Sequence, residues 1–412
     1  MSAAAIIIKD KEDFLHHYQD FKERFARMQP EKEVIVRDPE MDVEGYVVVW
    51  NTGISKNGPL GRCAKGGTRI TKDLKLEDIH RLSRAMAEKN AAAGLPLGGA
   101  KSGLKADPTA PDYEAKFKRF VELCRPILHE HGGIFGGFGY DIGGKPPFNA
   151  LWACDALKST RSFTGKPVDM GGTDYDKEGI AGLGVAVAAK VMLGYHGEDI
   201  QRSEFAVQGL GAMGSAVTRY FSEFGGKLKA LSDPKYHGSW LFNNVASDEM
   251  IAALVAQDVA RVNALLPSEA TCLGEDCFTA LYQKVDIVFP CAMEDAITVD
   301  NAHKIQARYV CEGANNPTTE AAHEILFSRG IHAVPDIIAN SGGIIAAYVE
   351  LTSNVDNEEN AKNRTKVEEA KRLTIEKVSA STADFLDLVK HVAAPADKVG
   401  DFIAWRNILY GV

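Results

Sequence analysis

The chain has 412 residues, a formal net charge of -9 at pH 7, and 45% hydrophobic and 25% charged residues. This length predicts two or three domains, and the composition is typical of folded chains with sizeable cores, which excludes a disordered or fibrous protein. Nonspecific nucleic-acid binding is not expected, because neutralising phosphates needs clustered lysine and arginine, and no basic run is present.

No apolar stretch approaches the 18 residues of a membrane-spanning helix, and the short apolar run at residues 3–8 ends at Lys9. We therefore expect a cytoplasmic chain that does not bind a membrane. The seven cysteines are scattered and include no CxxC pair, which predicts reduced thiols, no disulfide framework and no bound metal.

The first part of the chain alternates short apolar strands, at residues 34–36 and 46–49, with amphipathic helices. In the helical stretch after residue 73, apolar residues recur at three and four residues, and Lys89 continues the same face. The apolar members of this stripe are Leu76, Ile79, Leu82 and Met86. A lysine there either reaches solvent from the helix edge or meets an anion or a proton-transfer role.

Two further lysines and one aspartate stand in glycine-rich surroundings. Lys101 lies within residues 94–103, which we interpret as a turn with little side-chain bulk, and Lys65 precedes Gly66. Asp141 lies between two glycine-containing segments. A desolvated lysine has a lowered pKa and suits acid–base chemistry, although Lys65 alone is equally consistent with an exposed loop charge and Asp141 with an ordinary turn.

An independent pattern begins with an apolar strand at residues 205–208 and ends in an apolar-periodic helix at residues 216–224. The turn between them is Gly209-Leu210-Gly211-Ala212-Met213-Gly214. Such glycines let a pyrophosphate approach the backbone, and the helix N-terminus offers unpaired N–H groups. After the next strand, Asp233 is placed to bind ribose hydroxyls, which predicts a dinucleotide site. Asp233 favours NAD by repelling a 2′-phosphate, and the nearby Lys235 leaves NADP open.

Three more short apolar strands follow, at residues 286–289, 309–311 and 332–334, with helical stretches between them. This rhythm predicts an α/β fold with a Rossmann-like, doubly wound parallel sheet. We expect a substrate-binding and catalytic α/β domain at residues 1–166 and the dinucleotide-binding domain at residues 167–339.

From about residue 47 to residue 354 the chain resembles the glutamate/leucine/phenylalanine/valine dehydrogenase family. The intervals between the four charged residues are 24 (65 to 89), 12 (89 to 101) and 40 (101 to 141), which are typical of the glutamate-type members. The motifs that carry the resemblance lie at residues 64–69, 89–94, 96–103, 311–319 and 334–343.

The resemblance implies reversible oxidative deamination of an L-amino acid to a 2-oxo acid and ammonia, with hydride passing to a nicotinamide. It implies that Lys89 pairs with the substrate α-carboxylate, that Lys101 activates the attacking water, and that Asp141 exchanges protons with the amino group. Asn315 and Asn340 lie in its cofactor-domain and hinge motifs. Residues 340–412 are then a hinge and helices that return to the first domain, and a homo-oligomer is expected, with a hexamer favoured.

The predicted side-chain pocket departs from the family pattern. Glutamate-specific members hold the γ-carboxylate with a lysine, here Lys65, and a serine seven residues after the hinge asparagine, where this chain has Ala347. Gly66, Gly139 and Ile344 complete the wall. A buried charged Lys65 needs an acidic partner, which favours glutamate. The alternative is a hydrophobic amino acid such as leucine, valine or phenylalanine, with Lys65 turned away.

A second departure is Ala181 and Leu183, where the family usually has threonine and arginine. The change removes a hydroxyl near the nicotinamide, and Thr173 or Asp174 is expected to replace it. Two other classes stay open: a hydroxy-acid dehydrogenase on a similar fold, and an inactive nucleotide-binding regulatory homologue. The first leaves the lysines unexplained, and the second leaves Lys101 and Asp141 unexplained.

Overall fold

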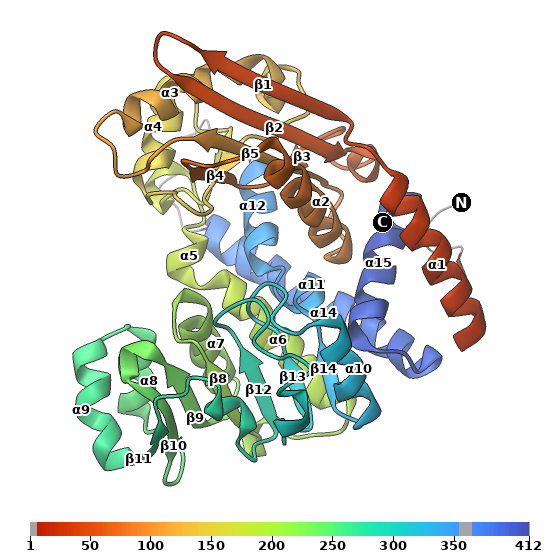
Figure 1. The fold of residues 1–412 in the computed structure, drawn as a ribbon, viewed down its shortest axis with the longest axis vertical. Coiled ribbons are helices and arrows are strands. Elements are labelled where there is room, and N and C mark those ends of the chain that lie inside the picture. The colour runs from red at the N-terminus through yellow and green to blue at the C-terminus, as the bar shows by residue number, and fades with distance from the viewer. Residues whose placement is uncertain (1–5, 354–364, 412) are drawn as a thin grey trace. The chain divides into compact units, whose positions relative to one another are not determined.

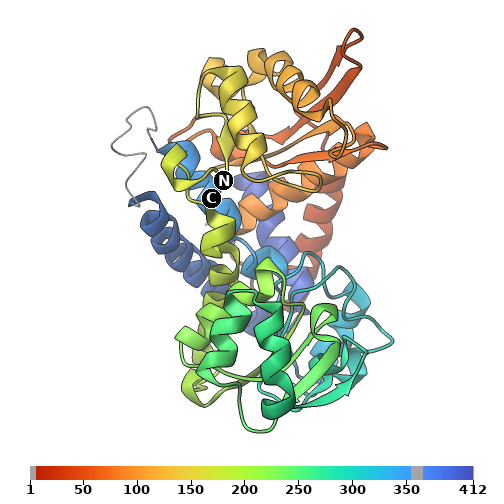
Figure 2. The same cartoon turned by 90° about the vertical axis from the view of Figure 1, so that its left-hand side faces the viewer.

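The computed structural model describes residues 6–353 and 365–411, and the chain folds into two compact units (Figures 1 and 2). Unit 1 contains Met1–Glu178, Ile344–Ala370 and Asp401–Val412. Unit 2 contains Gly179–Gly343 and Lys371–Gly400. The C-terminal part thus contributes to both units, and the boundaries expected after residues 166 and 339 stay predictions.

Unit 1 is built on a five-stranded mixed sheet in which β5 is central. Strands β1, β2 and β5 pair in antiparallel fashion, whereas β3 and β4 run parallel to β5. The strands are β1 (Lys32–Asp38), β2 (Val43–Asn51), β3 (Ala64–Lys65), β4 (Thr68–Thr71) and β5 (Gly98–Lys105). The two sequence-predicted strands are therefore confirmed within β1 and β2.

Strand β2 contributes apolar side chains to both faces of this sheet, because successive side chains of a strand point to opposite sides. Val47 and Val49 belong to a large core with the phenylalanines of α3 (Tyr113–Leu123). Tyr46 and Val48 pack with Ile79 of α2 (Leu76–Ala92). Figures 1 and 2 show the sheet between α2 on one face and α3 with α4 (Phe148–Leu157) on the other.

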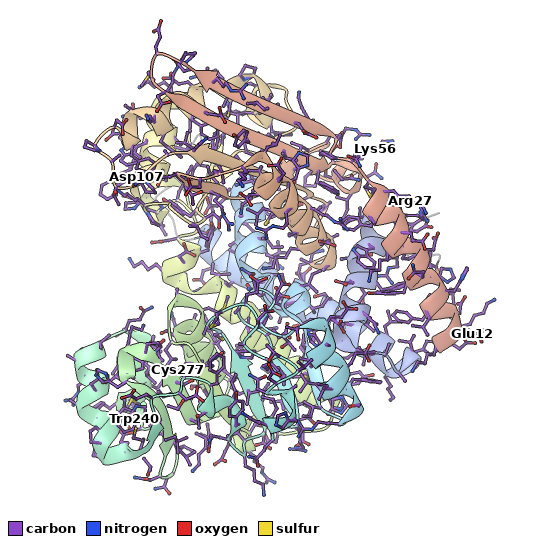
Figure 3. All side chains as sticks on the ribbon, viewed as in Figure 1. Glu12, Arg27, Lys56, Asp107, Trp240 and Cys277 are labelled. Atoms are coloured by element: carbon purple, nitrogen blue, oxygen red, sulfur yellow. The ribbon has the colours of Figure 1, made fainter. Side chains whose placement is uncertain are left out.

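The remaining elements of unit 1 include α1 (Lys11–Arg27), which carries acidic Glu12 in its first turn and basic Arg27 in its last (Figure 3). This order suits the helix dipole. Phe21 of α1 stacks on Phe402 of α15 (Ala396–Tyr410) with ring centroids 5.1 Å apart. The other elements are β6 (Phe138–Gly139), β7 (Phe163–Thr164), α5 (Tyr175–Glu178), α12 (Gly342–Thr352), and the 3-10 helices η2 (Gly53–Ser55), η3 (Arg125–Ile127), η4 (His129–His131) and η5 (Val168–Met170).

Unit 2 contains a seven-stranded sheet in the order β11-β10-β9-β8-β12-β13-β14. Its five parallel strands confirm the predicted Rossmann-like sheet: β8 (Glu204–Gln208), β9 (Lys227–Asp233), β12 (Ile287–Pro290), β13 (Tyr309–Cys311) and β14 (His332–Val334).

Two antiparallel strands at one edge of this sheet, β10 (Gly238–Phe242) and β11 (Ala270–Gly274), were not expected from the sequence. Most residues of β11 are exposed or only partly buried, so the strand lacks the continuous apolar run that marks its parallel neighbours. Trp240 of β10, labelled in Figure 3, donates its indole N–H to the Tyr236 carbonyl at 2.7 Å.

The apolar α6 (Ile180–Tyr195) is a largely buried helix that packs on strands β13 and β14. A segment including it, Tyr175–Tyr195, is long and apolar enough to cross a membrane, yet 61% of its most apolar window is buried inside the protein, as in a core helix. Other helices are α7 (Ala212–Glu223), α8 (Asp248–Val255), α9 (Val259–Glu269), α10 (Glu320–Ser328), α11 (Asp336–Ala339) and α14 (Thr365–Val392), with η6 (Ile200–Arg202), η7 (Pro234–Tyr236), η8 (Thr279–Tyr282) and η9 (Ala302–Lys304).

Candidate active site

Lys101 lies in the middle of strand β5, so the predicted glycine-rich turn is wrong. The glycines serve a different purpose, which is to let helix α2 lie directly on the strand. A Cβ on Gly99 would come within 2.1 Å of the Ala87 backbone nitrogen, and one on Gly103 within 2.5 Å of the Leu74 side chain. The strand is therefore buried on both sides, and Lys101 is only 6% exposed.

Lys101 and Asp141, the two predicted catalytic residues, are in direct contact. The Lys101 Nζ lies 3.0 Å from Asp141 Oδ2, and the Arg69 Nε donates to the same oxygen at 3.0 Å. Burial lowers the pKa of Lys101 more than Asp141 raises it. Burial acts to raise the pKa of Asp141, but Lys101 and Arg69 outweigh it, so that pKa is lowered. The arrangement joins a lysine that can lose its proton to a carboxylate that stays ionised.

Lys89 is half-buried, and its position corrects the predicted stripe on α2. The buried face of this helix runs through Ile79, Ser83, Ala87 and Asn90, whereas Leu82, Met86 and Lys89 are only partly covered. The charge of Lys89 adds, as the smallest of the named causes, to the lowering of the pKa of Lys101. A site that holds both is suited to an anionic substrate group.

Lys65 is buried, with 4% of its surface exposed, which excludes the exposed loop charge. Its Nζ donates to the carbonyls of Gly66 at 2.8 Å and Phe138 at 2.7 Å. Burial lowers the pKa of Lys65 to about 7; Glu350 opposes this effect, and Lys101 and Lys166 add to it. A Cβ on Gly139 would lie 3.1 Å from this Nζ, so the glycine leaves room beside the ammonium.

Sequence reasoning missed Glu350, an acidic residue that influences Lys65. Its side chain is fully buried on α12, one turn after Ala347, and lies 2.8 Å from the Lys166 Nζ. Its oxygens also accept from the Gly165 N–H at 3.2 Å and from the N–H and hydroxyl of Thr173 at 2.7 Å each. The sequence feature that could have identified it is a single carboxylate within the otherwise apolar run of residues 344–351.

The placement of Thr173 argues against the predicted contact with the nicotinamide. The residue is fully buried, and its hydroxyl already donates a hydrogen bond to Glu350.

Two predicted members of the substrate pocket wall, Ile344 and Ala347, lie on α12, where Ala347 is buried and Ile344 is half-buried. A Cβ on Gly66 would lie 1.7 Å from the Ala100 carbonyl oxygen, so only glycine fits beside β5.

The glycine-rich turn of unit 2 has the geometry of a phosphate-binding turn. Gly209 has a φ of +82°, and a Cβ on Gly214 would lie 1.8 Å from the Gly209 carbonyl oxygen. Helix α7 begins at Ala212 after Gly211, with no side-chain cap on its first N–H groups. Those groups are the donors that a pyrophosphate needs.

Asp233 ends strand β9 beside this turn, as predicted for a ribose-binding carboxylate. Its Oδ2 accepts from the Leu210 N–H at 2.7 Å and its Oδ1 from the Lys235 N–H at 2.8 Å. Lys235 in turn donates its Nζ to the Leu210 carbonyl at 2.9 Å. Both side chains therefore brace the turn, and the carboxylate oxygens keep lone pairs for a hydroxyl.

Three predicted cofactor residues from separate segments, Met213, Asn315 and Asn340, line one cavity of about 350 Å³ in unit 2. The Asn340 amide donates to the Gly313 carbonyl at 2.8 Å and lies 3.4 Å from Asn315 Oδ1. The cavity also touches residues just after β12 and β13. Ligands of open α/β sheets bind at these carboxyl ends of strands, so the chain's own residues fit a dinucleotide there.

No cluster of three or more metal-binding side chains occurs in residues 6–353 and 365–411. Glu130, which lies between His129 and His131, accepts hydrogen bonds from the hydroxyls of Ser159 and Ser162 at 2.6 Å each. The seven cysteines are free thiols.

A buried lysine–aspartate couple and a dinucleotide turn on a parallel sheet define a nicotinamide-dependent dehydrogenase. The model of the family Glutamate/Leucine/Phenylalanine/Valine dehydrogenase matches residues 171–395, and that of the Glu/Leu/Phe/Val dehydrogenase dimerisation domain matches residues 30–137. The chain therefore belongs to the Glu/Leu/Phe/Val dehydrogenase family and is an NAD(P)-dependent amino acid dehydrogenase.

Similar curated proteins include the NADP(+)-dependent glutamate dehydrogenase of Pyrobaculum calidifontis, which is 31% identical over 349 residues and matched over 82% of this chain and 80% of its own length. The NAD-specific glutamate dehydrogenase of Peptoniphilus asaccharolyticus is 29% identical over 340 residues, 79% of this chain and 78% of the relative. Relatives of both cofactor types thus resemble the chain to a similar degree.

Among solved structures, hetero-hexameric glutamate dehydrogenase from Thermus thermophilus matches with a TM-score of 0.73 and 22% identity, covering 97% of this chain and 96% of that one. L-tryptophan dehydrogenase from Nostoc punctiforme matches with a TM-score of 0.65 and 22% identity, covering 94% and 98%. At these identities the likeness shows the shared fold.

Proposed function

We propose that the protein catalyses the reversible oxidative deamination of L-glutamate to 2-oxoglutarate and ammonia, with NAD favoured as the hydride acceptor and NADP accepted. The observation that carries the choice of glutamate is Lys65, a buried ammonium with a glycine beside it. A buried cation in the side-chain pocket favours an acidic substrate. The curated relatives named above are glutamate dehydrogenases, which supports the same choice.

Lys89 holds the substrate α-carboxylate in this proposal. When bound, the nicotinamide accepts the hydride from the substrate Cα. Lys101 then takes a proton from the water that attacks the iminium carbon, because burial favours its neutral form. Asp141, 3.0 Å from Lys101, relays protons between this lysine and the nitrogen that departs as ammonia.

A hydrophobic L-amino acid is the second candidate, and Ala347 is the observation that favours it. This position lacks the hydroxyl that complements the lysine in glutamate-type pockets, and Glu350 supplies an internal negative charge toward Lys65. With a pKa of about 7, Lys65 is largely neutral in mildly alkaline solution. The free-energy cost of placing an apolar substrate side chain beside it is then smaller.

We further propose a homo-hexamer in the cytoplasm. The match of residues 30–137 to a dimerisation domain and the hetero-hexameric neighbour from Thermus thermophilus support an oligomer. Light scattering of the purified protein tests the subunit number. A mass other than that of six chains contradicts the hexamer, and a mass equal to one chain contradicts any oligomer.

The primary test is reduction of the nicotinamide followed by absorbance across a panel of L-amino acids, with NAD and NADP in parallel. Turnover led by glutamate is expected. Turnover led by leucine, valine, phenylalanine or tryptophan selects the second candidate. Silence across the panel, with dinucleotide binding retained, overturns the proposed activity and favours a regulatory homologue.

Replacing Lys65 by methionine is expected to lower kcat/KM for glutamate by about 10- to 100-fold, because a hydrogen bond to a charged group contributes about 1.5–3 kcal/mol. Leucine should be unaffected or improved. In the wild type, the ratio of glutamate to leucine kcat/KM should fall as pH rises through about 7, since Lys65 loses its proton there. Steady-state kinetics from pH 6 to 9 measure both effects.

The matched control for this prediction is Lys158→Met, which changes an exposed lysine of the same unit. It should leave both substrates and the pH dependence unchanged. If Lys65→Met keeps full glutamate activity, Lys65 does not bind the γ-carboxylate.

A further inference from the structure

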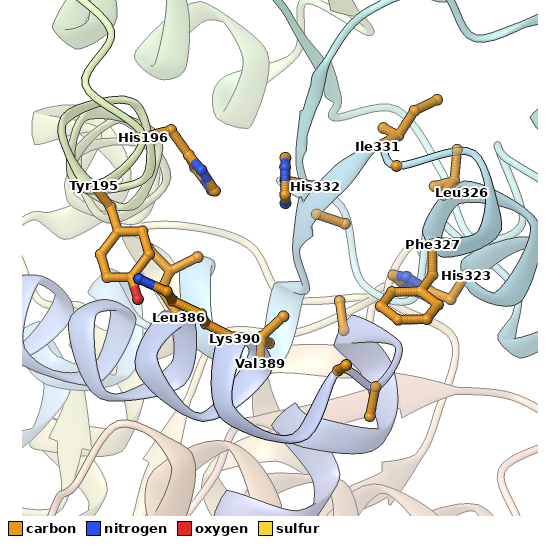
Figure 4. A pocket seen from close by; sticks show the side chains of 15 residues that line it. Tyr195, His196, His323, Leu326, Phe327, Ile331, His332, Leu386, Val389 and Lys390 are labelled. Atoms are coloured by element: carbon orange, nitrogen blue, oxygen red, sulfur yellow. The ribbon is translucent and has the colours of Figure 1, made fainter. Parts of the chain in front are cut away.

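Unit 2 contains a second cavity, of about 520 Å³, that shares no residue with the predicted substrate or cofactor sites. It lies where α6 ends, beside α10, the start of β14 and the end of α14 (Figure 4). Strand β14 runs parallel to β8. Its first residue, His332, therefore lies at the amino ends of these strands, whereas the glycine-rich turn follows the carboxyl end of β8. The volume suits a small organic ligand.

Most of the cavity wall is apolar or aromatic. The rings of His196 and His332 face each other with centroids 4.1 Å apart and an angle of 36° between their planes (Figure 4). Burial lowers the pKa of both imidazoles, and His332 lowers that of His196 further, so they act as neutral aromatic walls. The aliphatic and phenyl side chains are Leu326, Phe327, Ile331, Leu386 and Val389.

His323 lines this cavity and has one ring nitrogen that is buried and has no partner in the described part of the chain. The residue is 3% exposed, and its Nε2 lies 3.0 Å from Glu312 Oε1. Its Nδ1 has no hydrogen-bond partner within the described part of the chain. Burial acts to lower the pKa of His323, but Glu312, with Asp397 and Asp336, outweighs it, and the pKa is raised. In the protonated ring, both nitrogens carry a hydrogen, and Nδ1 is then a donor. Buried polar atoms normally have partners, so this donor points to a ligand acceptor.

A second cation lines the same cavity. Lys390 of α14 is exposed, and its Nζ lies 6.0 Å from the centre of the Tyr195 ring. Tyr195 is held by the hydrogen bond from its hydroxyl to Asp387 at 2.8 Å. The lining thus combines an apolar body with two groups that can donate to an anion, His323 in its protonated form and Lys390.

We propose that this cavity is a regulatory site for a small organic carboxylate with an aliphatic or aromatic body. The body lies between the imidazole pair and the aliphatic side chains of α10 and α14. The carboxylate accepts from His323 Nδ1, and Lys390 adds a favourable field. A charge-assisted hydrogen bond of this kind favours the carboxylate over a neutral amide of the same shape.

A physical route links His323 to the cofactor cavity within unit 2. Glu312, its ion-pair partner, accepts with Oε2 from the Asp336 N–H at 2.9 Å, at the first residue of α11. Glu312 also directly precedes Gly313, which lines the cofactor cavity and accepts from Asn340. A ligand that moves the His323 ring changes how firmly Glu312 holds the start of α11 and the segment at Gly313. Binding at the two cavities should therefore be coupled. Such coupling is reciprocal, so the dinucleotide should change the affinity for the carboxylate by the same factor.

The test is calorimetric binding of 4-methylpentanoate and 3-phenylpropanoate, with their amides as neutral controls. The protein is the full chain carrying Lys89→Met, which removes the proposed partner of the substrate α-carboxylate, and the Val389→Trp variant below distinguishes the cavity from the substrate site. One saturable site per chain is expected, with the carboxylates bound about fivefold or more tighter than the amides. The dinucleotide Kd should change about fivefold or more when the site is saturated.

Val389→Trp, which fills the cavity, should abolish binding, while Ile375→Trp on the exposed part of the same helix should not. His323→Gln should remove the preference for carboxylate over amide, and saturable dinucleotide binding by this variant, at whatever Kd, verifies folding. Absence of binding, binding that survives Val389→Trp, or equal affinity for amide and carboxylate overturns the site. Binding without any change in the dinucleotide Kd overturns the regulatory role. None of these outcomes depends on the substrate of the enzyme.

Discussion

Replacing Lys101 by alanine is expected to lower kcat by about 10²–10⁴-fold, the range typical of a lost general base, with the dinucleotide Kd unchanged. Lys101 is buried on β5 and contacts Asp141 at 3.0 Å, whereas the glycine-rich turn at Gly209 belongs to the other unit. Lys101→Ala should therefore lower turnover without changing the affinity for the dinucleotide. Steady-state kinetics and fluorescence titration with the dinucleotide measure the two quantities.

The direction in which kcat/KM changes with pH tests which form of Lys101 is active. Because the neutral amine is the active base, kcat/KM should rise with pH through the lowered pKa of Lys101. Lys101→Arg should be as inactive as the alanine variant, since a guanidinium stays protonated. Lys105→Ala, at the exposed end of the same strand, is the matched control and should keep full activity. An alanine variant within tenfold of the wild type would remove Lys101 from the mechanism.

The parallel strands of unit 2 were predictable because strands buried on both faces are short continuous apolar runs. The same reasoning failed at β5, where the sequence shows glycines instead of bulk. The glycines there reflect the close approach of α2, and that approach involves residues such as Ala87 that are distant in the chain. A single segment does not reveal whether its glycines serve a turn or a helix packed on a strand.

The lysines of the candidate site were identified because charge is unusual in apolar or glycine-rich surroundings. Asp141, the partner of Lys101, was identified with them, whereas Arg69, Lys166 and Glu350 were not. Arg69 and Asp141 are 72 residues apart, and Lys166 and Glu350 are 184 residues apart, so these pairings depend on the folded chain. The helical period placed Lys89 on the correct helix but assigned it to a buried stripe, while the structure turns that stripe partly toward solvent.

Removing the buried carboxylate of Glu350 is expected to have the largest effect on stability. Lys166 and Glu350 are almost completely buried, with 1% and 0% of their side chains exposed and 2.8 Å between Nζ and Oε2. Glu350→Ala leaves the Lys166 ammonium without its carboxylate and removes the acceptor of Thr173 and Gly165. Breaking such a pair costs about 3–5 kcal/mol of unfolding free energy. Urea unfolding at one fixed protein concentration measures it.

The double variant Lys166→Met with Glu350→Leu tests whether this loss comes from an unpaired charge. Replacing both partners by apolar side chains removes the uncompensated ammonium, so the double variant should be more stable than Glu350→Ala. Glu376→Ala, which breaks an exposed pair with Arg372 on α14, should cost at most about 0.5 kcal/mol. If the double variant is no more stable than Glu350→Ala, the hydrogen bonds to Thr173 and Gly165, and not the ion pair, account for the stability that Glu350 provides.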